Sequence, residues 1–249
     1  MQQKSNLLHR IPKKYRPHFE TITDESYSIN PKLEKFLYKD GLVLKPNIGS
    51  RSRNTYHLFM KNEKLIVKDL FTLKINNKSM HNNLLDFLGD IKTFKKREGI
   101  YSNLILMPYL KHSNILPKND ISIVFRTISE YSMEQDQISI KEAWMEIFDK
   151  NNNLNIINHE QYLFNIDRPQ MRLEELEKIL NFKFKNEELR KIYKLLFSAS
   201  KAVHSILPPI NEVAWDWIKT DNKLYLLEGN SSFSLYPIKY FKILKNRLH

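Results

Sequence analysis

Short apolar runs separated by turn residues fill the first half of the chain. Residues 42–46 and 104–110 are two such runs, and residues 54–60 and 64–73 are rich in β-branched and aromatic side chains on either side of a polar turn. Short apolar runs between turns and segments rich in β-branched and aromatic residues are both typical of strands. Residues 82–95 instead place leucine, isoleucine and phenylalanine near helical spacing. The pattern therefore predicts three strands, one helix and a fourth strand, in that order.

The first 40 residues follow a different pattern. They are basic, carry three prolines and contain one short helical pattern, residues 31–38. Pro31 suits the first turn of that helix, and Gly41 suits its end. We expect residues 1–40 to form a separate N-terminal segment.

Longer elements are expected in the second half. Residues 121–130 read as a strand, whereas residues 137–148 fit either a strand or, from Glu142, the start of a helix. Residues 154–164 show no clear pattern. Apolar residues at helical spacing predict helices at 173–180 and 187–206, and a basic amphipathic helix or tail at 238–248. His204 lies in the last turn of the second helix, where a protonated imidazole interacts favourably with the helix C-terminus.

A hairpin near the C-terminus combines an apolar body with acidic side chains. The apolar runs 213–218 and 224–228 flank the polar group Thr220-Asp221-Asn222-Lys223. Glu228 and Asn230 are two residues apart, so they point to the same face of a strand. Asp216 joins them, opposite Glu228, if the turn holds an odd number of residues.

These three side chains form an all-oxygen set. Two carboxylates and an amide oxygen suit Mg²⁺, which shares the rest of its coordination shell with water and phosphates. The alternative is a set of ordinary surface acids. The tryptophans and leucines of the hairpin favour a buried strand pair, where an unpaired acid is rare.

The amino-acid composition excludes several classes of protein. The 249 residues are 41% hydrophobic and 12% aromatic, which is enough for a globular core. No apolar run reaches the length of a membrane-spanning helix, and the N-terminus lacks the apolar region of a signal peptide. The absence of cysteine excludes disulfides, zinc–thiolate sites and thiol nucleophiles. We expect a cytoplasmic protein.

The charge favours anionic partners. The formal net charge is +12, but no block of five or six basic residues marks a tail. We expect an anionic or carbohydrate-linked small molecule as substrate rather than nucleic acid. A peripheral role at an anionic membrane surface also stays open.

The hairpin resembles a known family. A Trp-Asp pair at Trp215-Asp216, followed twelve residues on by Glu228-Gly229-Asn230 and preceded by a helix with His204, is similar to the closing segment of the ATP-grasp superfamily. It is most similar to members associated with sugar transfer and surface polysaccharides. The resemblance implies an α+β fold in which two lobes with antiparallel sheets hold ATP between them. It also implies that Asp216, Glu228 and Asn230 bind the Mg²⁺ that bridges the ATP phosphates.

The resemblance extends to residues 41–235. It implies a smaller nucleotide-binding lobe at 41–112 and a larger lobe with the metal site at 113–249. In the smaller lobe, Lys45 ends an apolar strand before a loop and would contact the phosphates. Met107 and Leu110 would contact adenine at the hinge, although an ordinary edge strand is the alternative.

The loop after Lys45 departs from the family pattern. ATP-grasp loops usually offer several glycines, and this one has only Gly49. Ser50 and Ser52 could donate hydroxyl groups to phosphate, and Arg51 and Arg53 could bind phosphate bidentately. The loop could equally have lost phosphate binding.

Arg126 lies inside an apolar strand that resembles the family's Asn-Thr-x-Arg strand. A buried arginine needs an anion. A transferring phosphoryl group or an acyl phosphate would supply one, and Arg126 would then be catalytic. A structural ion pair with a neighbouring acid is the alternative.

The resemblance implies an ATP- and Mg²⁺-dependent ligase that joins a carboxylate to an amine through an acyl phosphate. A role in surface polysaccharide or sugar-conjugate biosynthesis, with partners from that process, would fit the most similar members. A kinase acting on a sugar hydroxyl would need the same ligands, and a non-catalytic binding domain is the third interpretation.

Overall fold

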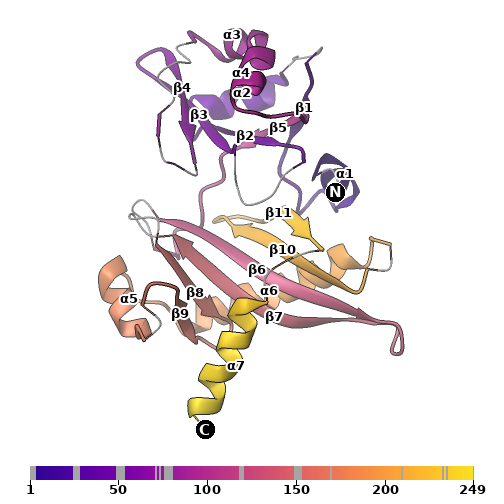
Figure 1. The fold of residues 1–249 in the computed structure, drawn as a ribbon, viewed down its shortest axis with the longest axis vertical. Coiled ribbons are helices and arrows are strands. Elements are labelled where there is room, and N and C mark those ends of the chain that lie inside the picture. Colours follow the sequence, from indigo (N-terminus) through magenta and orange to yellow (C-terminus); the bar gives the residue numbers. More distant parts are fainter. Residues whose placement is uncertain are drawn as a thin grey trace. The chain divides into compact units, whose positions relative to one another are not determined.

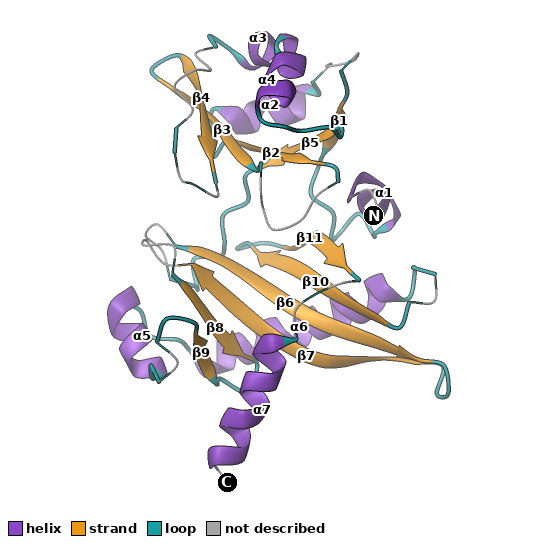
Figure 2. Cartoon of the chain, in the orientation of Figure 1, coloured by secondary structure: helices purple, strands orange, loops and turns teal. Residues whose placement is uncertain are grey.

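The chain folds into two compact units. The computed structural model describes residues 4–24, 29–48, 54–70, 72, 74–75, 81–117, 121–148, 153–168, 170–208, 210–231, 233 and 235–248. The first unit comprises residues 1–9 and 17–111, and the second comprises 10–16 and 112–249. Figures 1 and 2 show the elements of each unit. No helix in the described part of the chain is long and apolar enough to cross a membrane.

The first unit contains a five-stranded antiparallel sheet in the order β1-β5-β2-β3-β4. Its strands are β1 (Glu20–Ile22), β2 (Leu42–Pro46), β3 (Tyr56–Lys61), β4 (Lys64–Asp69) and β5 (Leu104–Pro108). The helices of this unit are α1 (Lys4–Arg10), α2 (Pro31–Leu37), α3 (Leu84–Gly89) and α4 (Ile91–Arg97).

Local sequence sets the bounds of α2. The side chain of Asn30 accepts a hydrogen bond from the Lys32 amide, and Pro31 occupies the first turn. The helix ends where the Gly41 amide donates to the carbonyl of Phe36 at 2.7 Å. Gly41 has φ +88°, and a Cβ there would lie 2.3 Å from His57 Nε2, so only glycine fits.

The helix expected at residues 82–95 is two helices. Asn83 caps α3 through a bond to the Asp86 amide, and the chain turns at Gly89-Asp90, where Asp90 has φ −92° and ψ 8°. Glycine is a poor helix former, and aspartate favours the start of a helix over its interior. The apolar spacing nevertheless serves both helices, because α3 and α4 bury their leucine, isoleucine and phenylalanine side chains in one core.

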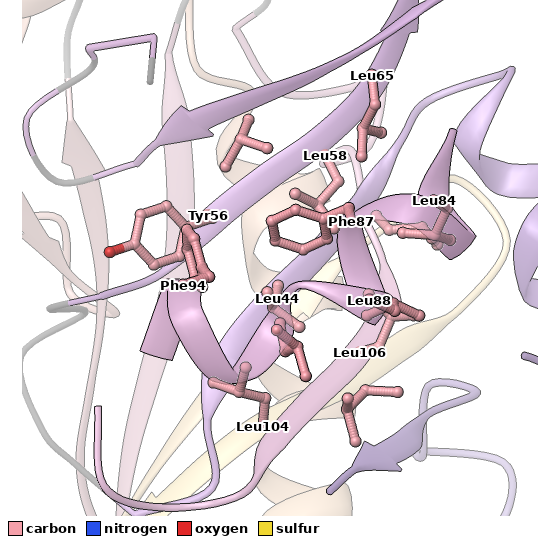
Figure 3. Close-up of a cluster of buried hydrophobic side chains, with 14 of the residues drawn as sticks. Leu44, Tyr56, Leu58, Leu65, Leu84, Phe87, Leu88, Phe94, Leu104 and Leu106 are labelled. Atoms are coloured by element: carbon pink, nitrogen blue, oxygen red, sulfur yellow. The ribbon is translucent and has the colours of Figure 1, made fainter. Parts of the chain in front are cut away.

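Side chains from α2, α3 and α4 pack on one face of this sheet. Figure 3 shows Phe87 and Phe94 of the helices against Leu44, Tyr56 and Leu58 of the strands. Phe94 meets both Tyr56 and Phe87 edge to face, with ring centroids 5.0 and 5.1 Å apart. This core holds the first unit together.

Two elements of the N-terminal segment were not expected, α1 and β1. Strand β1 pairs with β5. Helix α1 is fixed by a buried reciprocal contact in which the Ser5 amide donates to Asn47 Oδ1 at 2.8 Å and Asn47 Nδ2 donates to Ser5 Oγ at 2.9 Å. These partners are 42 residues apart, so local pattern does not reveal them.

The second unit contains a six-stranded antiparallel sheet in the order β11-β10-β6-β7-β8-β9. Its strands are β6 (Ser122–Ser132), β7 (Gln137–Phe148), β8 (Leu154–Asn158), β9 (Leu163–Asn165), β10 (Glu212–Lys219) and β11 (Leu224–Asn230). Its helices are α5 (Leu173–Leu180), α6 (Asn186–His204) and α7 (Tyr236–Leu248). Residues 137–148 are therefore a strand, and the unassigned stretch 154–164 contributes β8 and the start of β9.

Helices α6 and α7 cover opposite faces of this sheet, as Figure 2 shows. Ile238 and Phe241 of α7 pack in an apolar cluster with Ile128, Trp144 and Ala214 of the strands. The neighbouring strand residues Thr127 and Ser129 point to the other face, toward α6. The C-terminal segment is thus a helix with a buried apolar stripe.

A chain of buried hydrogen bonds joins α6 to the sheet. Trp215 Nε1 donates to Ser129 Oγ at 2.6 Å, and this hydroxyl lies 2.7 Å from His204 Nδ1. His204 Nε2–H donates to the Ile210 carbonyl at 2.8 Å. His204 is therefore a buried member of the core, with a partner at each ring nitrogen. The interaction of a protonated His204 with the helix C-terminus stays a prediction, and tertiary partners lie at both ring nitrogens.

Candidate functional site

The hairpin register places Asp216 opposite Glu228 and Ala214 opposite Asn230. The turn between Lys219 and Leu224 has four residues, an even number. The register shifts by one residue at a β-bulge between Asp216 and Trp217, because Trp217 pairs with Leu226 and Leu227 is an extra residue of β11. This shift compensates for the even number of turn residues. Asp216, Glu228 and Asn230 therefore share one face of the sheet, by a route other than the odd turn expected from the sequence.

Arg126 lies directly opposite Asp216 on the next strand, β6. Its Nε and Nη2 donate to the two carboxylate oxygens of Asp216 at 2.6 and 2.8 Å. This bidentate arrangement is the strongest form of an arginine–carboxylate contact. The anion that a buried arginine requires is thus present within the chain, and a catalytic role for Arg126 stays a prediction.

Glu146 on β7 is a second partner of Arg126 that the sequence alone did not single out. Its Oε1 lies 3.1 Å from Arg126 Nη1 and also accepts a bond from Trp144 Nε1 at 2.9 Å. Glu146 is 9% exposed. The only sequence signal was an acid in an otherwise apolar strand end, Ala143–Ile147, which is compatible with many roles.

These side chains form a polar row across four adjacent strands: Glu228 of β11, Asp216 of β10, Arg126 of β6 and Glu146 of β7. Burial raises the pKa of Asp216, an effect that Arg126 opposes and that the nearby Glu228 and Glu146 reinforce. Burial alone would lower the pKa of Arg126, but Asp216 and Glu146 raise it overall. The arginine is therefore charged, and its guanidinium balances the acids around it.

The side-chain oxygens of Asp216, Glu228 and Asn230 are chemically suited to Mg²⁺, but some of them already accept hydrogen bonds from other side chains. Glu228 and Asn230 are half-buried, and Asn230 Nδ2 donates to Glu228 Oε1 at 3.1 Å. Asp216 offers oxygens that Arg126 now binds. Among the described residues, no group of three or more His, Cys, Asp or Glu side chains is arranged to hold a metal ion. Metal binding would therefore draw on Glu228, Asn230 and ligand oxygens, and on the lone pairs that Asp216 keeps beside its bonds to Arg126.

The other predicted site residues belong to the first unit. Lys45 and Met107 are buried, and the register of β2 and β5 directs both to the face opposite α2, α3 and α4. Leu110 follows β5 and is half-buried. Ser50, Arg51, Ser52 and Arg53 lie outside the described residues. The roles assigned to all of these residues in nucleotide binding remain predictions.

A scan against protein-family models finds no match for the sequence, and a search of curated proteins finds none either. Solved structures do match. Carboxyaminoimidazole ribonucleotide synthase from Aspergillus clavatus complexed with ATP matches at a TM-score of 0.51 and 9% identity, over 94% of this chain and 45% of that one. N5-carboxyaminoimidazole synthase from the same organism, in complex with ADP and 5-aminoimidazole ribonucleotide, matches at 0.50 and 8% identity with the same coverage.

D-alanine–D-alanine ligase from Bacillus anthracis complexed with ATP is more distant, with a TM-score of 0.42 and 14% identity over 92% of this chain and 51% of that chain. This chain thus spans about half the length of the structures that it matches. Identities this low show the fold alone. The predicted α+β class with two antiparallel sheets is confirmed, and the chain shares its fold with the matched synthases.

Proposed function

We propose that this chain binds ATP with Mg²⁺ and acts as an ATP-dependent ligase that joins a carboxylate to an amine. The polar row Glu228–Asp216–Arg126–Glu146 carries this proposal. It places metal-type oxygen donors beside a charged arginine on one face of a sheet. The shared fold with ATP-complexed synthases adds support.

The residues of the candidate site would have separate roles. Asp216, Glu228 and Asn230 would hold Mg²⁺, which when bound neutralises phosphate charge. Arg126 has two carboxylate partners, so it can release Asp216 and still keep Glu146. A guanidinium freed in this way binds the three oxygens of a transferring phosphoryl group and stabilises the charge that develops there.

The proposed reaction has two steps. The carboxylate of one substrate attacks the γ-phosphorus of ATP, which releases ADP and leaves an acyl phosphate. The amine of a second substrate then displaces phosphate and forms the amide. In the first unit, Lys45, Ser50, Arg51 and Ser52 would contact phosphates, and Met107 and Leu110 would contact adenine. A place in surface polysaccharide or sugar-conjugate biosynthesis is part of the proposal and rests on the sequence resemblance only.

One observation favours a second candidate, a non-catalytic binding domain. Both oxygens of Asp216 are engaged by Arg126, and Asn230 is bonded to Glu228. Side chains that already pair with one another through hydrogen bonds and ion pairs need no cation to balance them. The two candidates differ in whether Mg²⁺ changes nucleotide binding.

Titration calorimetry of ATP, with and without Mg²⁺, tests the proposal on wild type, Glu228→Gln and Glu134→Gln. Glu134 is an exposed acid in the β6–β7 turn and serves as the matched control. We expect Mg²⁺-dependent binding in wild type and the control, and a loss of about tenfold or more in Glu228→Gln. Trapping with hydroxylamine then tests for an acyl phosphate. ATP binding that is equally tight with and without Mg²⁺, or no ATP binding at all, would contradict the ligase proposal and leave the non-catalytic candidate.

A further inference from the structure

The first half of β7 is an open edge of the six-stranded sheet. In the described part of the chain, β8 pairs with β7 from Trp144 to Phe148, and the His159 amide extends this contact to the Ala143 carbonyl at 2.9 Å. No described strand pairs with residues 137–142 on that side. Figure 1 shows the β6–β7 hairpin reaching beyond the strands beside it. Its β7 edge is therefore open to another strand.

The backbone groups at this edge point outward. The Tyr131 amide donates to the Asn211 carbonyl at 2.8 Å, on the side of β6 that faces away from β7. Opposed residues of an antiparallel pair either bond to each other or both turn away. Ile138, which is opposite Tyr131, thus turns its N–H and C=O away from β6, and so does Ile140, two residues further along.

Other edges of this sheet are protected in the ways that proteins commonly use. On β11, the Leu226 amide is bonded to the Tyr15 carbonyl at 2.8 Å, and β9 is a buried strand of only three residues. A lysine at an edge also discourages pairing. Lys141, the extra residue of a bulge in β7, instead donates across β6 to Glu212 of β10. Residues 138–140 are therefore left as an uncharged, unprotected edge.

We propose that a second copy of this chain pairs with this edge about a two-fold axis at Ser139. Antiparallel pairing places Ile138 opposite Ile140 of the second copy, and Ile140 opposite Ile138 of the second copy. Since both residues turn their backbone groups outward, the pairing forms four main-chain hydrogen bonds. The β-branched side chains meet on one face of the joined sheet. The segment is thus complementary to itself, as a two-fold interface requires.

The interface is small, so we expect a transient dimer with a Kd of about 100 µM. Sedimentation equilibrium of the full chain without nucleotide measures it, and the result does not depend on the proposed ligase function. The mean mass should rise toward that of two chains as concentration passes the Kd. Ile140→Pro removes an outward N–H but no bond to β6, and should weaken the dimer about tenfold or more. Glu134→Gln, in the β6–β7 turn, should dimerise like wild type.

A second test gives a gain of signal. The chain has no cysteine, so Ser139→Cys places a single thiol on the proposed axis. Its Cα would lie about 4.5 Å from that of the second copy, as in a pair without mutual hydrogen bonds, and a disulfide can span this distance. Oxidised glutathione should therefore cross-link Ser139→Cys about tenfold or more faster than Met133→Cys, whose position is 75% exposed in the turn and lies off the axis.

Circular dichroism checks that each variant is folded. The proposal is overturned if Ile140→Pro dimerises as tightly as wild type, or if the two thiols cross-link at the same rate. It is also overturned if wild type stays monomeric at several times the expected Kd, which would leave the open edge to an extended peptide of another protein.

Discussion

Arg126 is held by two acids that differ in geometry. Asp216 binds it through two hydrogen bonds, whereas Glu146 makes one ion pair and also accepts from Trp144. Removing one partner of a buried pair leaves the other charge uncompensated. The two acids should therefore contribute unequally to stability.

We predict that Asp216→Asn lowers the free energy of unfolding by about 3 kcal/mol and Glu146→Gln by about 1 kcal/mol. Urea unfolding followed by tryptophan fluorescence measures this. All three tryptophans, Trp144, Trp215 and Trp217, belong to the second unit, so the signal reports that unit. Equal losses in the two variants would show that the bidentate geometry confers no advantage.

A second residue-scale prediction concerns pH. His159 Nδ1 lies 2.9 Å from Glu142 Oε1, and this hydrogen bond raises the pKa of His159 above its usual value although burial opposes the rise. A raised pKa in the folded state means that the protonated form is stabilised. Its contribution is complete below the unfolded pKa of about 6.5 and is lost as pH rises through the folded value.

We therefore expect the stability difference between wild type and His159→Gln to shrink as pH increases from about 6 to 8. Unfolding at several pH values measures this difference, in which the other titrating groups cancel. A difference that grows with pH would mean that neutral His159 is the stabilised form.

At the scale of elements, the hydrogen-bond chain under α6 explains how a helix is fixed to a sheet. Trp217 Nε1 donates to Thr127 Oγ1, which lies 2.6 Å from Ser200 Oγ, and Trp215 reaches His204 through Ser129. Each buried polar atom in these chains has a partner. A single deletion therefore leaves several groups unsatisfied.

We predict that Ser129→Ala destabilises the second unit by about 2 kcal/mol, because the Trp215 indole and the His204 ring each lose a buried partner. Ser205→Ala, in an exposed position at the end of α6, is the control and should change stability by less than about 0.5 kcal/mol. Thermal unfolding of the two variants compares them. Similar melting temperatures would contradict a structural role for the buried hydroxyl.

At the scale of the whole molecule, the chain near its N-terminus is divided between the two units. Residues 10–16 belong to the second unit, and the flanking residues belong to the first. Tyr15 is buried, its ring meets Trp217 edge to face at 5.8 Å, and its carbonyl accepts from the Leu226 amide at 2.8 Å. Residues 10–16, which lie within the N-terminal segment expected at 1–40, thus pack against the hairpin.

Tyr15→Ala should lower the unfolding free energy of the second unit by about 3 kcal/mol, because it removes a large buried ring. The exposed neighbour Lys13 provides the control, and Lys13→Ala should have little effect. Tryptophan fluorescence during urea unfolding follows both variants. An unchanged midpoint in Tyr15→Ala would show that residues 10–16 do not support the second unit.

The sequence by itself determined the strands of residues 42–73 and 104–110, the helices near 173–180 and 187–206, the α+β class and the face shared by Glu228 and Asn230, but not the two helices within 82–95 or the strands within 137–164. These features depend on local periodicity and on turn residues such as Gly41, which act over a few positions. Only the tertiary structure decided the rest. Whether Asp216 joins that face depended on a bulge at Leu227, and Arg126 and His204 find Asp216 and Ser129 on strands that are 90 and 75 residues away in the sequence. Long-range pairing sets these contacts, and no local pattern encodes it.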